Sequence, residues 1–196
     1  MKEAYKKQVN LLLRLLPEVA KEKNFALHGG TGINLFEQNL PRLSVDIDLT
    51  YITFGERAKD LQSIRMLLEE LKTRIKNRMP TIVFSDPIVA AENLKILCTT
   101  KEASVKIEVN QINRGLIGAS RTMTLCEKAQ EEFDSFCEIT VVSSKQLWGG
   151  KIAAALDRQH LRDLFDVNNL LNGTGFTEDI KSGFLFFLLC GKKTHK

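Results

Sequence analysis

The stretch that decides the fold is FALHGGTGINLFEQNLPRLSVDIDLTY, residues 25–51. It begins with three apolar residues, 25–27, which predict a short buried strand that runs directly into the glycine turn 28–32. Ile33, Leu35 and Phe36 then open a short helix. Residues 42–49 alternate polar and apolar side chains, the period-two pattern of a half-buried strand. The order of strand, glycine turn, helix and strand predicts an α/β unit.

Two carboxylates stand out on the second of these strands. Asp46 and Asp48 are two residues apart, so both side chains project from the same face. Like charges at that distance raise one another's pKa unless a cation lies between them. The pair therefore suggests a divalent metal, with Mg²⁺ (or Mn²⁺) held by one or two carboxylates and by substrate phosphate oxygens. The alternative is a solvated polar face on an edge strand.

A second strand with the same alternation is predicted over residues 104–110, and its polar face carries Lys106, Glu108 and Asn110. If this strand pairs beside the first, Glu108 becomes a third carboxylate. Three acidic side chains on adjacent strands can hold two metal ions. The alternative is an exposed Lys/Glu face of an antiparallel sheet.

The glycine turn predicts a phosphate cradle. Gly29 and Gly30 permit close approach of the backbone, and a helix opened by Thr31 points its free N–H groups at an anion. The turn matches neither the nucleotide-binding P-loop pattern nor the dinucleotide-binding glycine pattern.

The remaining patterning predicts a mixed sheet flanked by helices, followed by a small helical lobe. A helix or helix pair over 3–22 is expected to bend or break at Pro17, and a basic helix is expected over 57–78. Further strands are predicted at 81–85, 93–99, 104–110 and 121–125, and helices at 144–158, 160–171 and 177–190. We therefore divide the chain into an α/β domain, 1–142, and a helical lobe, 143–196.

Composition excludes several classes of protein. The 196 residues carry 28 Lys and Arg against 24 Asp and Glu, a net charge of +4, which is too small for a protein that wraps a nucleic acid duplex. No apolar run approaches the ~20 residues that span a bilayer, so no membrane association is expected. The four cysteines are widely spaced, which predicts neither a zinc site nor disulfides and favours a cytoplasmic protein with reduced thiols.

The combination of Gly29-Gly30-Thr31, a short helix and Arg42-x-Ser44-x-Asp46-x-Asp48 resembles the nucleotidyltransferase superfamily with the polymerase-beta-like fold. The sequence of this region is more narrowly similar to the AbiEii/MenT family, the toxins of AbiE-type (type IV) toxin–antitoxin systems. A later stretch supports this: K-x-x-A-x-x-x-R over 151–158, followed by R-D-L-F-D over 162–166. The resemblance covers about residues 20–190, with a helical lobe shorter than the family generally carries.

The resemblance implies transfer of a nucleoside monophosphate from an NTP, such as GTP or ATP, to an acceptor that is expected to be RNA or tRNA. A cognate antitoxin encoded nearby is also implied. The expected catalytic residues are Asp46, Asp48, Glu108, Lys151 and Asp163, with the first three on the metal. The expected nucleotide-binding residues are Gly29, Gly30, Thr31, Arg42, Ser44, Lys106, Arg158 and Arg162.

Three cations of this set recur at i, i+7 and i+11. We expect Lys151, Arg158 and Arg162 to form one cationic stripe along a helical track, facing a triphosphate. The alternative is a solvated basic face.

Three other functions stay open. One is a catalytically weakened nucleotide- or partner-binding domain that uses the apolar stretch 184–190 as an interface between copies or with a partner. Another is a metal-dependent nuclease, although Lys106 precedes Glu108, the reverse of the usual order. The last is a nucleotidyltransferase that modifies small molecules.

Overall fold

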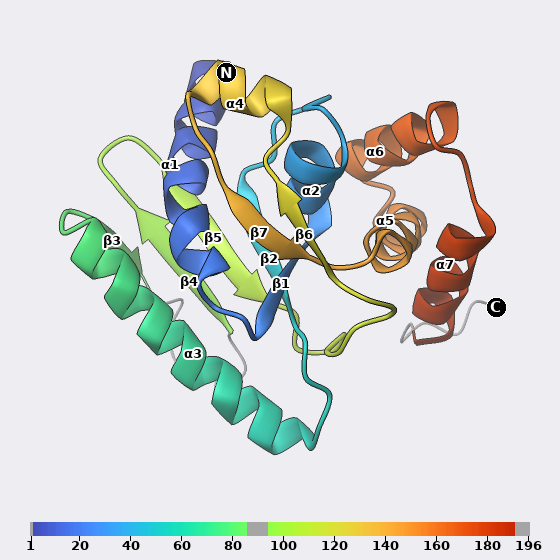
Figure 1. Cartoon of the computed structure of the whole chain (residues 1–196), viewed down its shortest axis with the longest axis horizontal. Coiled ribbons are helices and arrows are strands. Elements are labelled where there is room, and N and C mark those ends of the chain that lie inside the picture. The colour runs from blue at the N-terminus through green and yellow to red at the C-terminus, as the bar shows by residue number, and fades with distance from the viewer. Residues whose placement is uncertain (1, 86–93, 191–196) are drawn as a thin grey trace.

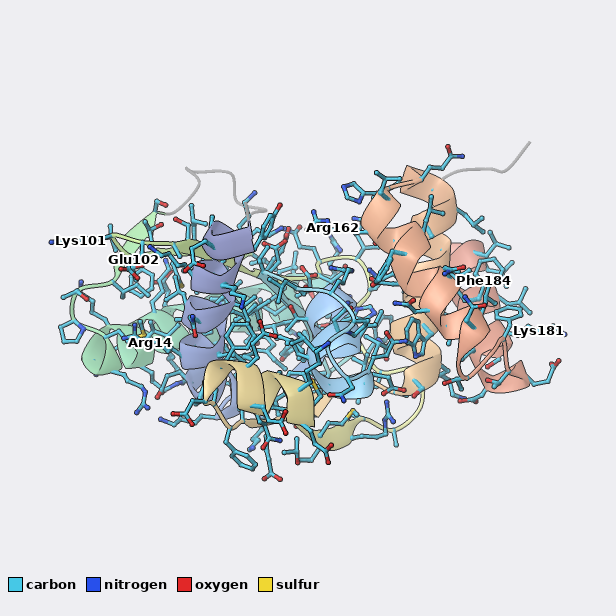
Figure 2. All side chains as sticks on the ribbon, turned by 90° about the horizontal axis from the view of Figure 1, so that it is seen from above. Arg14, Lys101, Glu102, Arg162, Lys181 and Phe184 are labelled. Carbon is cyan, nitrogen blue, oxygen red and sulfur yellow. The ribbon has the colours of Figure 1, made fainter. Side chains whose placement is uncertain are left out.

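The computed structural model describes residues 2–85 and 94–190 (Figure 1). Within these ranges one seven-stranded mixed sheet has the order β3-β4-β5-β2-β1-β7-β6. Three helices, α5 to α7, gather beyond one side of the sheet, and Figure 2 shows them as a separate group beside it. The predicted mixed α/β architecture is confirmed.

The centre of the sheet carries the two strands on which the site prediction depends. β2 (Asp46–Tyr51) lies between β1 (Phe25–His28), which is antiparallel to it, and β5 (Ser104–Val109), which is parallel. β7 (Glu138–Val141) extends the sheet beside β1 in parallel. The outer strands, all antiparallel to their neighbours, are β4 (Lys95–Thr99), β3 (Val83–Ser85) and β6 (Arg121–Thr124).

Two long helices support the sheet. α1 (Lys2–Ala20) packs against β5, β7 and α3 (Arg57–Arg78). Its apolar residues at helical spacing, such as Leu12 and Leu16, are fully buried. Pro17 lies inside the single helix, so the predicted alternative of a helix pair is wrong. Among the described residues no helix is long and apolar enough to cross a membrane.

The helix at the glycine turn starts earlier in the sequence than predicted. The helical turn α2 starts at Gly29 and ends at Gly32, and a π-helical turn, η1 (Ile33–Glu37), continues it. Gly29 has a φ of 69°, the left-handed region that glycine adopts without steric cost. The predicted helix start at Thr31 is therefore wrong by two residues, because Gly29 can turn the chain sharply enough to leave β1 directly into the helix.

The three C-terminal helices, α5 (Ser144–Arg158), α6 (Leu161–Asn172) and α7 (Glu178–Cys190), match the predicted ranges closely. The Ser143 side chain caps α5 by accepting the Gln146 N–H at 3.3 Å. The predicted boundary at 142/143 lies in the connection between β7 and α5. The sequence interpretation missed β7 and the short helix α4 (Glu127–Phe133).

α5 and α7 cross at two glycines. A methyl group on Gly149 would overlap the backbone of α7 at Gly183, and one on Gly183 would overlap the Lys145 carbonyl of α5. Gly149 and Gly183 thus permit a close helix–helix contact. Phe187 is buried in this contact, whereas Leu185, Phe186 and Leu189 of the apolar stretch are exposed.

Gly183→Ala is expected to push α5 and α7 apart and to lower the free energy of unfolding by about 1–3 kcal/mol, the usual cost of overpacking. Urea unfolding followed by circular dichroism measures it. Ser182→Ala, on the same helix at an exposed position, is the matched control and should change stability by less than about 0.5 kcal/mol. Equal stability of the two variants would show that the crossing is looser than described.

α6 buries two carboxylates on the same face as the apolar side chain of Leu170. Its carboxylates Asp163 and Asp166 are buried, whereas Leu161, Leu164 and Phe165 on the opposite face are exposed. Buried carboxylates are rare unless they are paired. Their partners therefore lie in the interior between α6 and the rest of the protein, and they are described below.

Candidate active site

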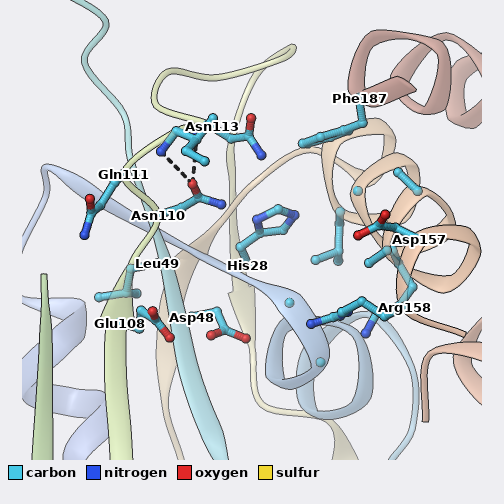
Figure 3. A pocket seen from close by; sticks show the side chains of 18 of the residues that line it. His28, Asp48, Leu49, Glu108, Asn110, Gln111, Asn113, Asp157, Arg158 and Phe187 are labelled. Carbon is cyan, nitrogen blue, oxygen red and sulfur yellow. Dashed lines mark hydrogen bonds between the residues drawn. The ribbon is translucent and has the colours of Figure 1, made fainter. Parts of the chain in front are cut away.

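A cleft of about 720 Å³ opens between the sheet and the helical lobe (Figure 3). One wall is formed by the sheet, with Asp48 of β2 and Glu108 of β5, and it continues into the loop 110–113. The opposite wall is α5, with Lys151 and Arg158. The cleft thus places two carboxylates across from two cations.

The strand register brings the predicted acidic residues together. β2 and β5 pair so that Asp46 is opposite Lys106 and Asp48 is opposite Glu108. The strand pairing that a third carboxylate at Glu108 requires is therefore present. Asp48 and Glu108 line the cleft, whereas Asp46 lies two residues back along β2 and is not part of the lining. Burial raises the pKa of Asp48 to about 6, and Asp46 and Glu108 add to this effect against the opposing charge of Lys106.

A cluster of three metal-ligating side chains is not assembled in residues 2–85 and 94–190. Glu108 instead accepts a hydrogen bond from Lys106 Nζ at 2.5 Å, and this pairing raises the pKa of Lys106 although burial opposes its charged form. Neither Asp46 nor Asp48 has an ion-pair partner among these residues. The Asp46–Asp48 pair thus has the hard oxygen donors and the unneutralised charge that suit Mg²⁺.

Gly29 has a different neighbour from the one expected. Its α-carbon lies against the Asp48 carboxylate, where any β-carbon would overlap an Asp48 oxygen. The turn therefore lets the carboxylate of β2 pack onto the backbone that follows β1. Gly29 and Gly30 both line the cleft, as the phosphate-cradle hypothesis requires.

Thr31, Ser44 and Arg42 lie beneath the turn and do not line the cleft. The Thr31 hydroxyl is buried, donates its proton to the Asp46 carbonyl and is hydrogen-bonded to the Ser44 hydroxyl. The Arg42 guanidinium lies beside Gly30 and is engaged with Asp166. These side chains support the turn and β2 from behind, and their predicted contact with the nucleotide stays a prediction.

A chain of buried ion pairs joins the glycine turn to α5. Asp166 is fully buried and accepts two hydrogen bonds from Arg42, from Nε at 2.7 Å and from Nη2 at 2.6 Å. Its second oxygen lies 3.1 Å from Lys151 Nζ, which also donates to Asp163 at 2.8 Å. Arg158 completes the chain with a 2.9 Å bond to Asp163.

This ion-pair chain fixes Lys151 at the edge of the cleft and determines the charge state of Asp163. Burial would raise the pKa of Asp163, but the hydrogen bond from Lys151 and the charges of Lys151 and Arg158 outweigh it and lower that pKa. Asp166 is the most buried member of this ion-pair chain, and the sequence interpretation did not place it in the site. Its position in the R-D-L-F-D stretch was the available signal.

The prediction that Lys151, Arg158 and Arg162 form one cationic stripe is wrong. α5 ends at Arg158, Gln159 takes a left-handed conformation (φ 50°), and a new helix begins at Leu161. Arg162 is exposed on α6 and outside the cleft lining (Figure 2). Lys151 and Arg158 remain on α5, where Lys151 is buried and ion-paired and Arg158 is mostly exposed.

The cleft also contains uncharged polar residues that the sequence interpretation did not assign. His28 packs beside the Phe187 ring, and burial lowers its pKa to about 4, so it is neutral at pH 7. Asn110, Gln111 and Asn113 line the far part of the sheet wall. The signals were the position of His28 directly before the glycine turn and of Asn110 two residues beyond Glu108.

Comparisons with known proteins agree with this architecture. The family model described as nucleotidyl transferase AbiEii toxin, type IV TA system, matches residues 10–190. No curated protein matches the chain. Among solved structures the chain is similar to MenT4, a nucleotidyltransferase toxin of Mycobacterium tuberculosis H37Rv, with a TM-score of 0.62 and 16% identity. The similarity covers 86% of this chain and 59% of MenT4, so the chain spans less than two thirds of that relative.

Proposed function

This chain belongs to the AbiEii family of nucleotidyltransferase toxins, and from that premise we propose that its cleft transfers a nucleoside monophosphate from an NTP to an RNA acceptor. The observation that carries the proposal is the division of charge across the cleft. Asp48 and Glu108 lie on the sheet wall, and Lys151 and Arg158 lie on the α5 wall. A reaction of this kind needs mainly positioning and charge neutralisation, which these residue types supply.

The cations of α5 are suited to hold the triphosphate. Lys151 is fixed by Asp163 at 2.8 Å and by Asp166 at 3.1 Å, so its ammonium group is oriented before substrate arrives. Arg158 shares Asp163 and has an exposed side chain that can reach into the cleft. Gly29 and Gly30 line the same space and offer backbone approach to a phosphate group.

Asp46 and Asp48 are the residues that would hold Mg²⁺ (or Mn²⁺). A bound divalent ion supplies charge neutralisation at the phosphates and activates the attacking oxygen. Glu108 can join this set if Lys106 releases it. Lys106 would otherwise stay beside Glu108 and balance one of the acidic charges.

The proposed step is a substitution at the α-phosphorus. An oxygen of the acceptor forms a bond to that phosphorus while the bond to the β-phosphate oxygen breaks, and pyrophosphate leaves. The proton of the acceptor hydroxyl passes to a carboxylate oxygen on the β2–β5 wall. The products are the acceptor extended by one nucleoside monophosphate and free pyrophosphate.

We propose RNA, with tRNA as the first candidate, as the acceptor because basic side chains lead away from the cleft. Arg57, at the start of α3, donates to the Gln111 carbonyl of the cleft loop at 3.0 Å. The helix that follows carries further Lys and Arg side chains along 57–78. Growth arrest by such a modification, a cognate antitoxin that relieves it and a cytoplasmic location are parts of the same proposal.

The test incubates the protein with Mg²⁺, each NTP in turn and end-labelled total RNA. NTP-dependent lengthening of an RNA species supports transfer. Shortening that needs Mg²⁺ but no NTP would favour the nuclease alternative, and no change in any RNA would remove RNA as the acceptor.

A further inference from the structure

The cleft is chemically divided along its length. Its charged part contains the carboxylates of β2 and β5 and the cations of α5 described above. Beyond them the sheet wall continues as an uncharged surface, which we call the amide wall and define as Asn110, Gln111 and Asn113. Figure 3 shows the amide wall above Asp48 and Glu108, with His28 between it and the ring of Phe187.

Asn110 is held in one orientation by its own loop. Its Oδ1 accepts the backbone N–H groups of Ile112 and Asn113, each at 2.9 Å. Both lone pairs of that oxygen are therefore used, and the amide cannot exchange its two ends without losing both bonds. Asn110 consequently offers the cleft a fixed N–H donor, its Nδ2.

The other two amides can adapt. Within the described ranges, the side-chain amides of Gln111 and Asn113 have no hydrogen-bond partner in the protein. Each can present either a donor or an acceptor. The amide wall therefore combines one fixed hydrogen-bond donor with two amides that can each donate to a ligand or accept from it.

Planar rings complete this part of the cleft. The ring centroids of His28 and Phe187 are 6.3 Å apart with an interplanar angle of 30°. His28 Nε2 is engaged with the Gln146 carbonyl at 3.3 Å, so the ring is held in place. Gly150 lies against both rings, and its missing side chain leaves room for them beside α5.

We propose that the amide wall binds the base of the nucleotide and that Asn110 Nδ2 is its specificity-determining donor. This deepens the proposed function and rests on it. An NTP is an anion at one end and a neutral planar ring at the other, with donors and acceptors along its edge. The division of the cleft matches this, since cations and carboxylates lie at one end and amides with flat rings lie at the other. Carboxamides pair readily with base edges, and flat rings suit a stacked base.

The test is isothermal titration of the native chain and of Asn110→Ser with each of the four NTPs and with inorganic tripolyphosphate, all with Mg²⁺. Serine retains an oxygen that can accept the loop N–H groups but lacks the Nδ2 donor. We expect the native chain to bind one NTP more tightly than the other three. In the variant this affinity ratio should fall about tenfold, the effect of one hydrogen bond. Tripolyphosphate, which has no base, should bind both proteins equally.

Two further variants keep the test decisive. Asn77→Ser, at an exposed position on α3, is the matched control and should keep the base preference of the native chain. Asn113→Leu removes an adaptable amide and is expected to weaken base preference as well, and it replaces Asn110→Ser if that variant fails to fold.

The outcomes separate the two proposals. Binding of all four NTPs with equal affinity to the native chain, or an equal loss for all four in both amide variants, would overturn the base assignment while leaving nucleotide binding intact. Failure of the native chain to bind any NTP or tripolyphosphate would overturn the proposed function and the base assignment together.

Discussion

Asp48→Asn is expected to lower the rate of nucleotidyl transfer by about 10³-fold, the scale seen when one group that stabilises developing charge is removed. Asp48 lines the cleft and lies against Gly29, and its carboxylate has no ion-pair partner among the described residues. The amide of Asn has nearly the same shape but lacks the negative charge that would hold a divalent ion. Transfer of labelled nucleotide to RNA measures the effect.

The same substitution should leave the fold intact. The pKa of Asp48 is raised to about 6 chiefly by burial, so ionisation of Asp48 disfavours the folded state increasingly as pH rises towards 6. A neutral Asn removes this contribution, and the free energy of unfolding at pH 7 should be equal or greater. Asp134→Asn is the matched control, because Asp134 is exposed at a left-handed position that Asn tolerates.

Two results would contradict this account of Asp48. Activity of Asp48→Asn within tenfold of the native chain would remove the carboxylate from the reaction. A marked loss of stability in Asp48→Asn, with Asp134→Asn unchanged, would show that Asp48 acts mainly in holding the fold.

The second large effect is expected on stability. Asp166→Ala should lower the free energy of unfolding by about 3–5 kcal/mol, because it leaves buried cationic groups without their shared carboxylate. Asp166 is fully buried and binds Arg42, Lys151 and Asn34, at 2.6 Å, 3.1 Å and 3.2 Å for the nearest atoms. Its loss removes the ion pairs that join the glycine turn to α5. Urea unfolding at pH 7 measures the change.

An exposed ion pair provides the comparison. Asp179 pairs with Lys145 at 2.7 Å, and its side chain is 61% exposed. Asp179→Ala should therefore cost less than about 1 kcal/mol. Similar costs for Asp166→Ala and Asp179→Ala would mean that water or neighbouring groups replace the buried carboxylate, and that the ion-pair chain does not hold the lobe to the sheet.

Much of the fold followed from local pattern. Alternation of apolar and polar residues identified β2 and β5, and the spacing of apolar residues identified α1 and the three C-terminal helices. β7 was missed although its apolar residues, Ile139 and Val141, alternate with polar ones. The start of the glycine turn depended on the backbone of Gly29, which residue spacing does not reveal.

The site was less predictable because long-range pairing determines it. The polar faces of β2 and β5 indicated Asp48 and Glu108, but the position of Asp48 opposite Glu108 depends on the parallel pairing of those two strands. The cationic stripe failed because its spacing assumed one continuous helix through residue 159. α6 is the clearest case: its pattern favours burial of Leu161 and Phe165, whereas Asp166 is drawn inward by cations from α5 and from the segment before β2.

The central claim, transfer of a nucleoside monophosphate, is tested most directly by the position of the label in the NTP. The native chain is incubated with Mg²⁺, total RNA and the preferred NTP labelled at either the α- or the γ-phosphorus. Our account predicts that the α-label enters RNA, that the γ-label leaves as pyrophosphate and that Asp48→Asn lowers the rate of both by about 10³-fold. Entry of the γ-label into RNA, or release of the γ-label as free phosphate while RNA stays unlabelled, would contradict it.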